Sequence, residues 1–192
     1  MFGGAFDPPH HAHVALARAA VQELRLDHLL VVPTGQAWHK ARQLTPAEHR
    51  FAMARLAFGG VPRATVDNRE LRRAGPTYTV DTLRELAAEF PGATLYLLMG
   101  DDQAAGFTSW HDWAAIARLA VLCIAARGPS SGGLQALRRV PGVRVEPIVS
   151  MAPLPDSASD IRARLTSGQD FAELVPPDVA SYIEHHNLYA PA

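Results

Sequence analysis

The chain has 192 residues, 48% of them hydrophobic, which is enough to bury one substantial core and predicts a single domain over residues 1–192. The chain has 18 Lys and Arg and 19 Asp and Glu, which gives a net charge of −1. This balance argues against a general nucleic-acid-binding protein, which usually carries an excess of positive charge. No run of about 18 apolar residues and no signal-peptide pattern occurs, so we expect no membrane partner. The single cysteine, Cys123, lies in an apolar run, which predicts a buried thiol and a cytoplasmic protein.

Short apolar runs alternate with helical patterns along the chain, which predicts a Rossmann-like α/β fold, a parallel sheet with helices on both faces. The expected strands are 29–33, 65–69, 95–99, 120–125 and 143–149. The expected helices are 13–25, 46–58, 79–90, 112–118, 133–139, 159–166 and 177–186. Only Met1 and Phe2 precede the first glycine turn, so we expect either a stub of a first strand or a natural chain that begins several residues earlier.

Residues 3–13, GGAFDPPHHAH, are the most informative segment. The glycines let backbone approach a ligand, and the prolines fix a turn. His10 and His13 enter an apolar helix, where unpaired N–H groups and the positive end of the helix dipole favour an anion. The segment predicts a phosphate site; the alternative is a proline-rich turn with surface histidines. No metal site is expected, because no second ligand cluster with metal spacing accompanies the histidines.

This segment resembles the signature of the nucleotidyltransferase superfamily, G-G-[TS]-F-D-P-x-H-x-G-H. Two positions depart from it: Ala5 replaces Thr or Ser, and Ala12 replaces Gly. The first change loses a hydroxyl that could help to hold a phosphate, and the second adds a methyl at a place of close approach. The resemblance implies ATP-binding roles for Gly3, Gly4, Ala5, Phe6, His10 and His13.

Lys40 follows the strand at 29–33, in a loop at the edge where open α/β sheets bind ligands. The residue alone could equally be a solvated surface lysine. The loop resembles the P-x-x-x-P-P-H-K segment of the superfamily, with His39 and Lys40 kept and the two prolines replaced by Ala37 and Trp38. The resemblance implies that Lys40 contacts phosphates and the second substrate.

Residues 157–162, SASDIR, place hydroxyls at the start of a helix and an arginine on its first turns. That combination is a compact anion site, although alone it is also an ordinary capped helix. The segment resembles the superfamily's I-S-S-T-x-I-R motif. Ser159 takes the place of the Thr and Arg162 that of the Arg, while Asp156 and Ala158 replace the Ile and the second Ser.

Residues 100–102, GDD, directly follow the strand at 95–99. They resemble the G-x-D pattern of the superfamily, which implies that Gly100 and Asp102 lie at the ATP site with the carboxylate on the adenosine ribose. The alternative is an acidic turn that caps the next helix.

Two further segments narrow the resemblance to the nicotinate-nucleotide adenylyltransferases. Residues 77–83, TYTVDTL, resemble S-Y-T-x-D-T-L, and residues 108–110, TSW, resemble a T-W segment. The resemblance implies that Trp110 stacks on a pyridine ring, and that Tyr78, Thr79 and His111 bind the same mononucleotide beside a helix N-terminus. Trp110 could instead be core or lid packing.

The resemblance implies an enzyme that transfers the adenylyl group of ATP, bound to Mg²⁺, to nicotinate mononucleotide. Its catalytic residues would be His10, His13, Lys40 and Arg162, which position and neutralise phosphates. Two alternatives stay open: a related transferase for nicotinamide mononucleotide or another small phosphate, and a non-catalytic nucleotide-binding module. The number of cationic side chains argues against the module, because binding alone does not require so many.

Overall fold

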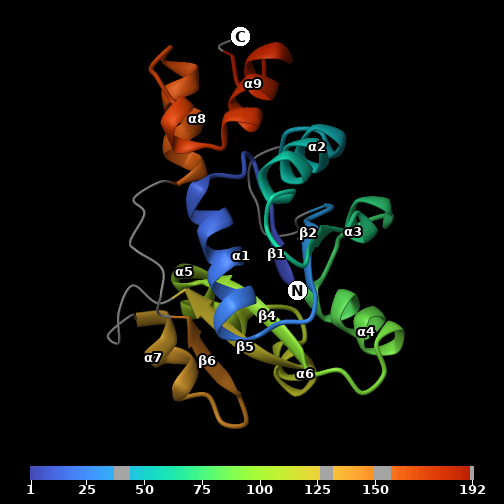
Figure 1. The fold of residues 1–192 in the computed structure, drawn as a ribbon. Helices are drawn as coiled ribbons and strands as arrows, with labels where there is room; N and C mark the ends of the chain where they lie inside the picture. The colour runs from blue at the N-terminus through green and yellow to red at the C-terminus, as the bar shows by residue number, and fades with distance from the viewer. Residues whose placement is uncertain (37–43, 126–131, 149–156, 191–192) are drawn as a thin grey trace.

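The structure is a computed structural model that describes residues 1–36, 44–125, 132–148 and 157–190 (Figure 1). The strands within these ranges form one parallel sheet in the order β3-β2-β1-β4-β5-β6. They are β1 (Phe2–Gly4), β2 (Leu29–Pro33), β3 (Ala64–Val66), β4 (Leu95–Gly100), β5 (Ala120–Ala125) and β6 (Val145–Ile148). The α-helices are α1 (His11–Glu23), α2 (Ala47–Phe58), α3 (Arg69–Arg72), α4 (Thr79–Glu89), α5 (Asp101–Ala105), α6 (Trp113–Leu119), α7 (Gly132–Arg138), α8 (Ala158–Thr166) and α9 (Pro177–His185). The Rossmann-like prediction is confirmed.

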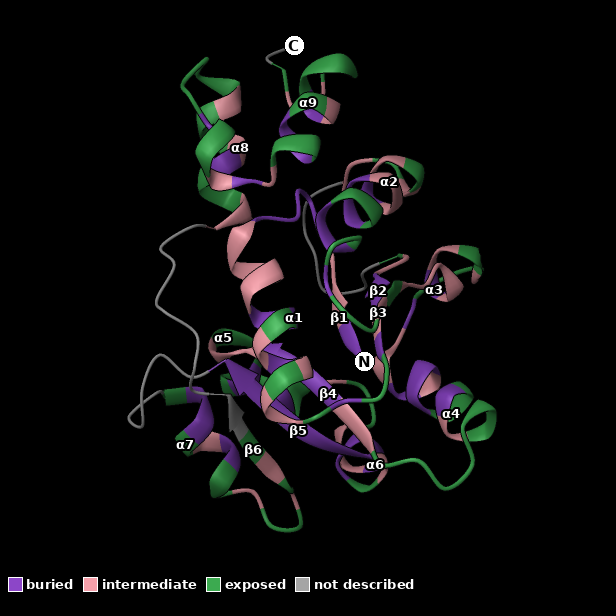
Figure 2. Ribbon diagram, viewed as in Figure 1, coloured by how far each residue is buried: buried purple, intermediate pink, exposed green. Residues whose placement is uncertain are grey.

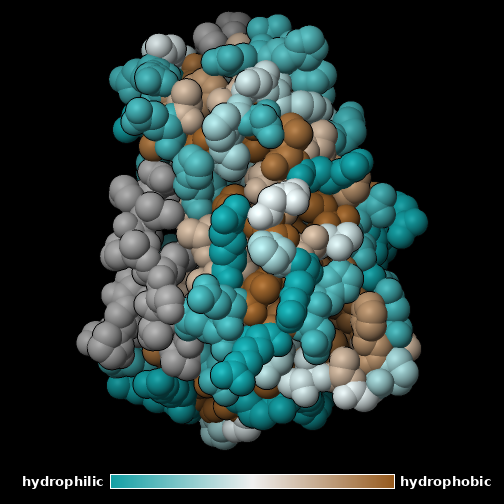
Figure 3. All heavy atoms as spheres, viewed as in Figure 1, coloured by the Kyte–Doolittle hydropathy of each residue, from teal (hydrophilic) through white to brown (hydrophobic). Residues whose placement is uncertain are grey.

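Helices cover both faces of the sheet, because successive strand residues point to opposite sides (Figures 1 and 2). On one face Phe2, Leu98 and Cys123 pack with α1, α2, α8 and α9. On the other face Leu97 and Leu122 pack with α4, α5, α6 and α7. The thiol of Cys123 is buried, as predicted. Figure 3 shows that the outer surface in this view is largely hydrophilic, with hydrophobic side chains in patches between.

None of the helices in the described ranges is both long and apolar enough to span a bilayer.

Four predicted boundaries are wrong by two residues or more. The strand expected at 65–69 ends at Val66, and Arg69 instead begins α3. Asp67 explains the difference, because its carboxylate accepts hydrogen bonds from the backbone N–H of Arg69 at 2.7 Å and from its guanidinium at 2.6 Å. Such local side-chain bonds compete with the strand ladder. Helix α1 begins and ends two residues earlier than the predicted helix 13–25. Strand β6 begins two residues later than the predicted strand 143–149.

The strand order places a crevice at the carboxyl ends of β1 and β4. From β1 the chain builds outward through β2 and β3, then returns to β4 on the other side of β1. The segments that follow β1 and β4 lead into helices on opposite faces of the sheet, α1 and α5. Ligands of open α/β sheets bind at such a reversal of strand order. Gly4 and Gly100, the last residues of the two strands, therefore mark the place where a site is expected.

We predict that Gly133→Ala lowers the free energy of unfolding by about 2 kcal/mol. A Cβ at this position would clash with the carbonyl oxygen of Asp101. It would also disturb the Asp101 carboxylate, which accepts from the amides of Gly133 at 3.0 Å and Leu134 at 3.3 Å. Gly132→Ala is the matched control, since a Cβ there meets nothing within 4 Å. Urea unfolding of both variants is the measurement, and equal stabilities would contradict the prediction.

Candidate active site

A cavity of about 320 Å³ opens at the carboxyl ends of β1 and β4. It is lined by the turn after β1, by the start of α4 and by the segment that follows β4. The predicted site residues that it brings together are Gly3, Gly4, Ala5, Tyr78, Thr79, Asp102, Trp110 and His111. Motifs that are up to 108 positions apart in the sequence, from Gly3 to His111, therefore line one cavity at the strand-order reversal.

The aromatic side of this cavity is formed by Trp110, Tyr78 and His111. Trp110 is half-buried, and its ring centroid lies 5.8 Å from that of the buried Phe107. The rings of Tyr78 and His111 lie 4.2 Å apart with an interplanar angle of 32°. Tyr78 is the N-cap of α4, and its side chain makes no capping hydrogen bond. Because Tyr78 and Thr79 both line the cavity, the first-turn N–H groups of α4 lie beside it. This side suits a planar ring that carries a negative group.

Glu70 also lines the cavity, and the sequence analysis did not identify it. Its carboxylate is buried and accepts from the Thr82 hydroxyl at 2.7 Å. Burial raises the pKa of Glu70, while hydrogen bonds from Thr82, Thr77 and the amide of Gly35 act in the opposite direction. These bonds connect α3, the loop after β2 and the start of α4. A glutamate between arginines in sequence gives no signal of such a role.

The turn after β1 shows why Gly4 is glycine. The ring of Phe6 lies directly over it, and a Cβ on Gly4 would come within 3.0 Å of that ring. Phe6 itself is buried in the core, with its ring centroid 5.3 Å from that of Phe58 and 5.2 Å from that of His13. Phe6 was expected at the ATP site. The structure leaves only its backbone for such a contact, because its side chain is part of the core.

His10 and His13 meet at the start of α1, where their ring centroids lie 3.8 Å apart. The backbone N–H of His10, the N-cap, donates to Nδ1 of His13 at 3.2 Å. In the neutral ring of His13 the hydrogen is therefore on Nε2, which becomes a donor. Nδ1 of His10 is buried and has no hydrogen-bond partner among the described residues. Burial lowers the pKa of His10 to about 4, with a smaller contribution from His11, so this ring is neutral at pH 7.

Arg162 reaches from α8 to the N-terminal segment. Its Nη1 donates to the carbonyl of Asp7 at 2.7 Å, and its Nη2 donates to the Ser159 hydroxyl at 3.1 Å. The N-cap of α8 is Ser157, whose hydroxyl accepts from the Asp160 amide at 3.1 Å. The helix thus begins before Ser159, which lies in its first turn. The two motifs that the sequence analysis connected, residues 3–13 and 157–162, are in contact.

The remaining predicted residues have different outcomes. Gly100 is the N-cap of α5, and Asp102 is exposed on that helix and lines the cavity. Asp101 instead accepts from the amides at the start of α7, which separates its role from that of Asp102. Lys40 lies outside the described residues, so its place stays a prediction. Within those residues, no three His, Cys, Asp or Glu side chains group so as to hold a metal ion.

A buried arginine that the sequence analysis missed supports the turn after β1. Arg50 of α2 is 3% exposed and donates to the carbonyls of Ala5 at 3.1 Å, Thr34 at 2.7 Å and Thr45 at 2.8 Å. Three backbone segments are thereby tied to one guanidinium. Arg50 is three and four positions before two buried residues of the same helix, Met53 and Ala54. This inward spacing is the one signal in the sequence that could have identified it.

Comparison with known proteins now identifies the family. Residues 1–164 match the model of a family described as cytidylyltransferase-like. A relative from Albidiferax ferrireducens, named "probable nicotinate-nucleotide adenylyltransferase", is 52% identical over 100% of this chain and 98% of its own. A relative of the same name from Bordetella petrii is 43% identical over 98% of this chain and 97% of its own. The chain belongs to the nicotinate-nucleotide adenylyltransferase family.

Solved structures agree with this assignment at the level of the fold. A nicotinic acid mononucleotide adenylyltransferase of Plasmodium falciparum, complexed with NaAD, superposes with a TM-score of 0.81 at 23% identity, over 98% of this chain and 95% of that one. The same enzyme complexed with APC gives 0.80 at 22% identity, over 98% and 94%. The resemblance read from the motifs is confirmed, and the adenylyltransferase fold extends over nearly the whole chain.

We predict that the protein loses stability as the pH falls from about 6.5 to about 4. The pKa of His10 is lowered from 6.5 to about 4 in the folded state. Between these pH values the unfolded chain therefore binds a proton more readily than the folded chain does. By pH 4 and below, this lowers the free energy of unfolding by up to about 3 kcal/mol. His10→Asn keeps an N-cap residue but does not titrate. Urea unfolding at pH 7 and at pH 4.5 should show a smaller loss in the variant; equal losses would contradict the assignment.

Proposed function

We propose that this protein transfers the adenylyl group of ATP to nicotinate mononucleotide, giving deamido-NAD and pyrophosphate, a step of NAD biosynthesis. The observation that carries the proposal is the cavity at the strand-order reversal, where the aromatic wall and the start of α4 face the turn after β1. Relatives that match over their full length carry the name of this activity. The P. falciparum enzyme with the same fold was solved with NaAD.

The pyridine ring of nicotinate mononucleotide is proposed to stack on Trp110, with Tyr78 and His111 beside it. Its carboxylate would accept hydrogen bonds from the first-turn amides of α4 at Thr79. The half-burial of Trp110 and the uncapped start of α4 support this placement. Glu70 lies in the same cavity, but its carboxylate is engaged by protein donors, which limits its repulsion of the substrate.

ATP is proposed to lie at the turn after β1, with its phosphates at the start of α1. Close approach of backbone is provided there by Gly3, Gly4, Ala5 and Phe6. His10 and His13 would donate to phosphate oxygens, and Arg162, Ser159 and Lys40 would hold the β- and γ-phosphates. Asp102, next to Gly100, would accept from the ribose hydroxyls. The unpartnered Nδ1 of His10 and the Arg162 contact with Asp7 support this arrangement.

The reaction needs no covalent enzyme intermediate. A phosphate oxygen of nicotinate mononucleotide attacks the α-phosphorus of ATP, a new P–O bond forms, and the bond to pyrophosphate breaks in line. Catalysis then consists of positioning and of donors aimed at the developing charge, with Nε2–H of His13 on the α-phosphate. Nucleotidyltransferases of this family generally use a divalent metal with ATP. We propose that the ion is Mg²⁺ and that it enters as part of the substrate.

We further propose that residues 1–192 work as one nucleotidyltransferase domain. Helix α9 packs against α2, and the hydroxyl of Tyr182 hydrogen-bonds Nδ1 of His49 at 2.9 Å. The C-terminal helices thus belong to the same packed unit as the sheet. A reaction that consumes ATP fits the cytoplasm, where we expect the protein to act.

We predict a preference for nicotinate over nicotinamide mononucleotide of about 10²-fold in kcat/KM. The start of α4 offers charge-assisted hydrogen bonds to a carboxylate, and the neutral amide cannot use them equally well. Trp110→Ala should weaken the binding of both mononucleotides and leave the ratio of their kcat/KM values largely unchanged, because the indole would stack on either ring in the same way. Pyrophosphate release with each substrate, ATP and Mg²⁺ measures this. Equal values, or a preference for the amide, would mean that the carboxylate site is misplaced.

His13→Ala should lower kcat by about 10²-fold or more, because it removes a donor that acts on charge formed in the transition state. The fold should persist, and the melting temperature of the variant is the check on that point. His185→Ala is the matched control: this histidine is exposed on α9, and its replacement should leave kcat unchanged. A normal kcat in the His13 variant would remove the residue from the mechanism.

A further inference from the structure

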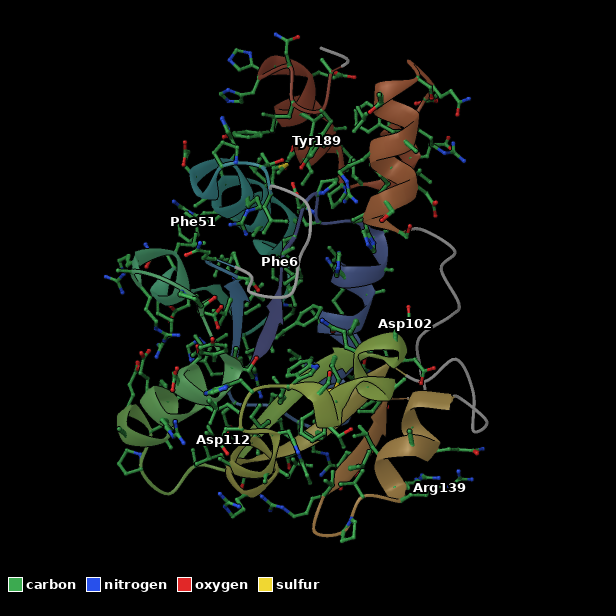
Figure 4. All side chains as sticks on the ribbon, turned by 180° about the vertical axis from the view of Figure 1, so that it is seen from behind. Phe6, Phe51, Asp102, Asp112, Arg139 and Tyr189 are labelled. Carbon is green, nitrogen blue, oxygen red and sulfur yellow. The ribbon has the colours of Figure 1, made fainter. Side chains whose placement is uncertain are left out.

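Asp7 is a buried carboxylate in the middle of the N-terminal segment. It is 1% exposed, and buried carboxylates require hydrogen-bond donors. The hydroxyl of Tyr189 donates to its Oδ1 at 2.7 Å, and the backbone N–H of Thr45 donates to its Oδ2 at 3.4 Å. In Figure 4, Tyr189 is labelled between α8 and α9, above Phe6. The shorter of these two bonds joins residues 182 positions apart, the two ends of the chain.

The same residue contacts the phosphate-binding arginine through its backbone. Nη1 of Arg162 donates to the Asp7 carbonyl at 2.7 Å. Asp7 also lies three positions before His10, the N-cap of α1. We propose that Tyr189 is a positioning residue for adenylyl transfer: by holding the Asp7 carboxylate it fixes the carbonyl that orients Arg162 and the turn that leads to His10. This proposal rests on the proposed function, and Tyr189 itself contacts no substrate.

The backbone after α9 places the Tyr189 hydroxyl at Asp7. Asn187 and Tyr189 both have positive φ, 48° and 65°, which is unusual for a residue with a side chain. The amide of Leu188 donates to the Ile183 carbonyl at 3.0 Å and closes the helix end, and Leu188 and Tyr189 pack against the core. Burial and the neighbouring Asp7 carboxylate raise the pKa of Tyr189, so its hydroxyl keeps its proton and remains a donor.

Loss of the hydroxyl has a specific consequence for Arg162. Without it, Oδ1 of the buried Asp7 carboxylate loses the shorter of the two hydrogen bonds described above. The Asp7 side chain is then held less firmly, and so is the Asp7 carbonyl that accepts from Nη1 of Arg162, so the guanidinium would be less well oriented toward the ATP phosphates. The aromatic wall at Trp110 and the start of α4 belong to other segments of the chain. The defect should therefore fall on ATP and not on the mononucleotide.

The test compares Tyr189→Phe with Tyr182→Phe. Both remove one hydrogen-bonded hydroxyl from the C-terminal region, but that of Tyr182 bonds His49 of α2. Tyr189→Phe should lower kcat/KM for ATP about tenfold and leave KM for nicotinate mononucleotide within about twofold; Tyr182→Phe should change neither by more than about twofold. Equal losses for both substrates, or equal losses in the two variants, would overturn the proposal.

A double-mutant cycle with Asp7→Asn separates positioning from general destabilisation. If Tyr189 acts through Asp7, the double variant should be no worse than Asp7→Asn alone, whereas losses that multiply would overturn the proposal. Calorimetry of ATP binding in the presence of Mg²⁺ compares the affinities of the two variants without turnover. It is done at a temperature well below the melting temperature of every variant. Tyr189→Phe should bind ATP about tenfold more weakly than Tyr182→Phe. Absence of turnover in the wild type would refute the proposed function, while equal ATP binding by the two variants would refute the role of Tyr189.

Discussion

The reversal of strand order places the parallel strands β1 and β4 side by side. The segments that follow these two strands lead to helices on opposite faces of the sheet. Backbone can close over neither strand end, so a crevice remains there. The turn after Gly4 forms one side of it, and the segment after Gly100 forms the other. Every substrate contact that we propose depends on this arrangement. A change in strand order would separate the motifs even if each kept its own local structure.

Elements that are distant in the sequence help to hold the N-terminal segment in shape. Arg50 donates hydrogen bonds to the carbonyls of Ala5, which follows β1, and of Thr34, which follows β2. Asp7 accepts hydrogen bonds from Arg162 of α8 and from Tyr189, which follows α9. Buried charges of this kind are stable only when their donors and acceptors are satisfied. The entropic cost of ordering this segment is met during folding, so the groups that we propose to bind phosphate are already in place in the protein without ATP.

The two ends of the site use different chemistry. The proposed mononucleotide end is built from aromatic faces and the start of a helix, which suit a planar ring with a single negative group. The proposed phosphate end is built from imidazole and guanidinium donors. Burial keeps His10 neutral there, and its Nδ1 has no hydrogen-bond partner among the residues that the structure describes. Glu70 connects the loop after β2 with the start of α4 through hydrogen bonds to its carboxylate.

The sequence by itself determined what depends on neighbouring residues. Apolar spacing and turn residues located the strands 29–33 and 120–125 without error. The spacing of His10 and His13 predicts an anion site at a helix start, and that site stays a prediction. The tertiary structure decided what depends on contacts across the chain. It ended a predicted strand at Val66, before Asp67, placed the N-cap of α8 at Ser157, and gave Tyr189 a hydrogen-bond partner in the N-terminal segment. Local patterns encode periodicity and caps, whereas a hydrogen bond across 182 residues exists only once the sheet order has brought its partners together.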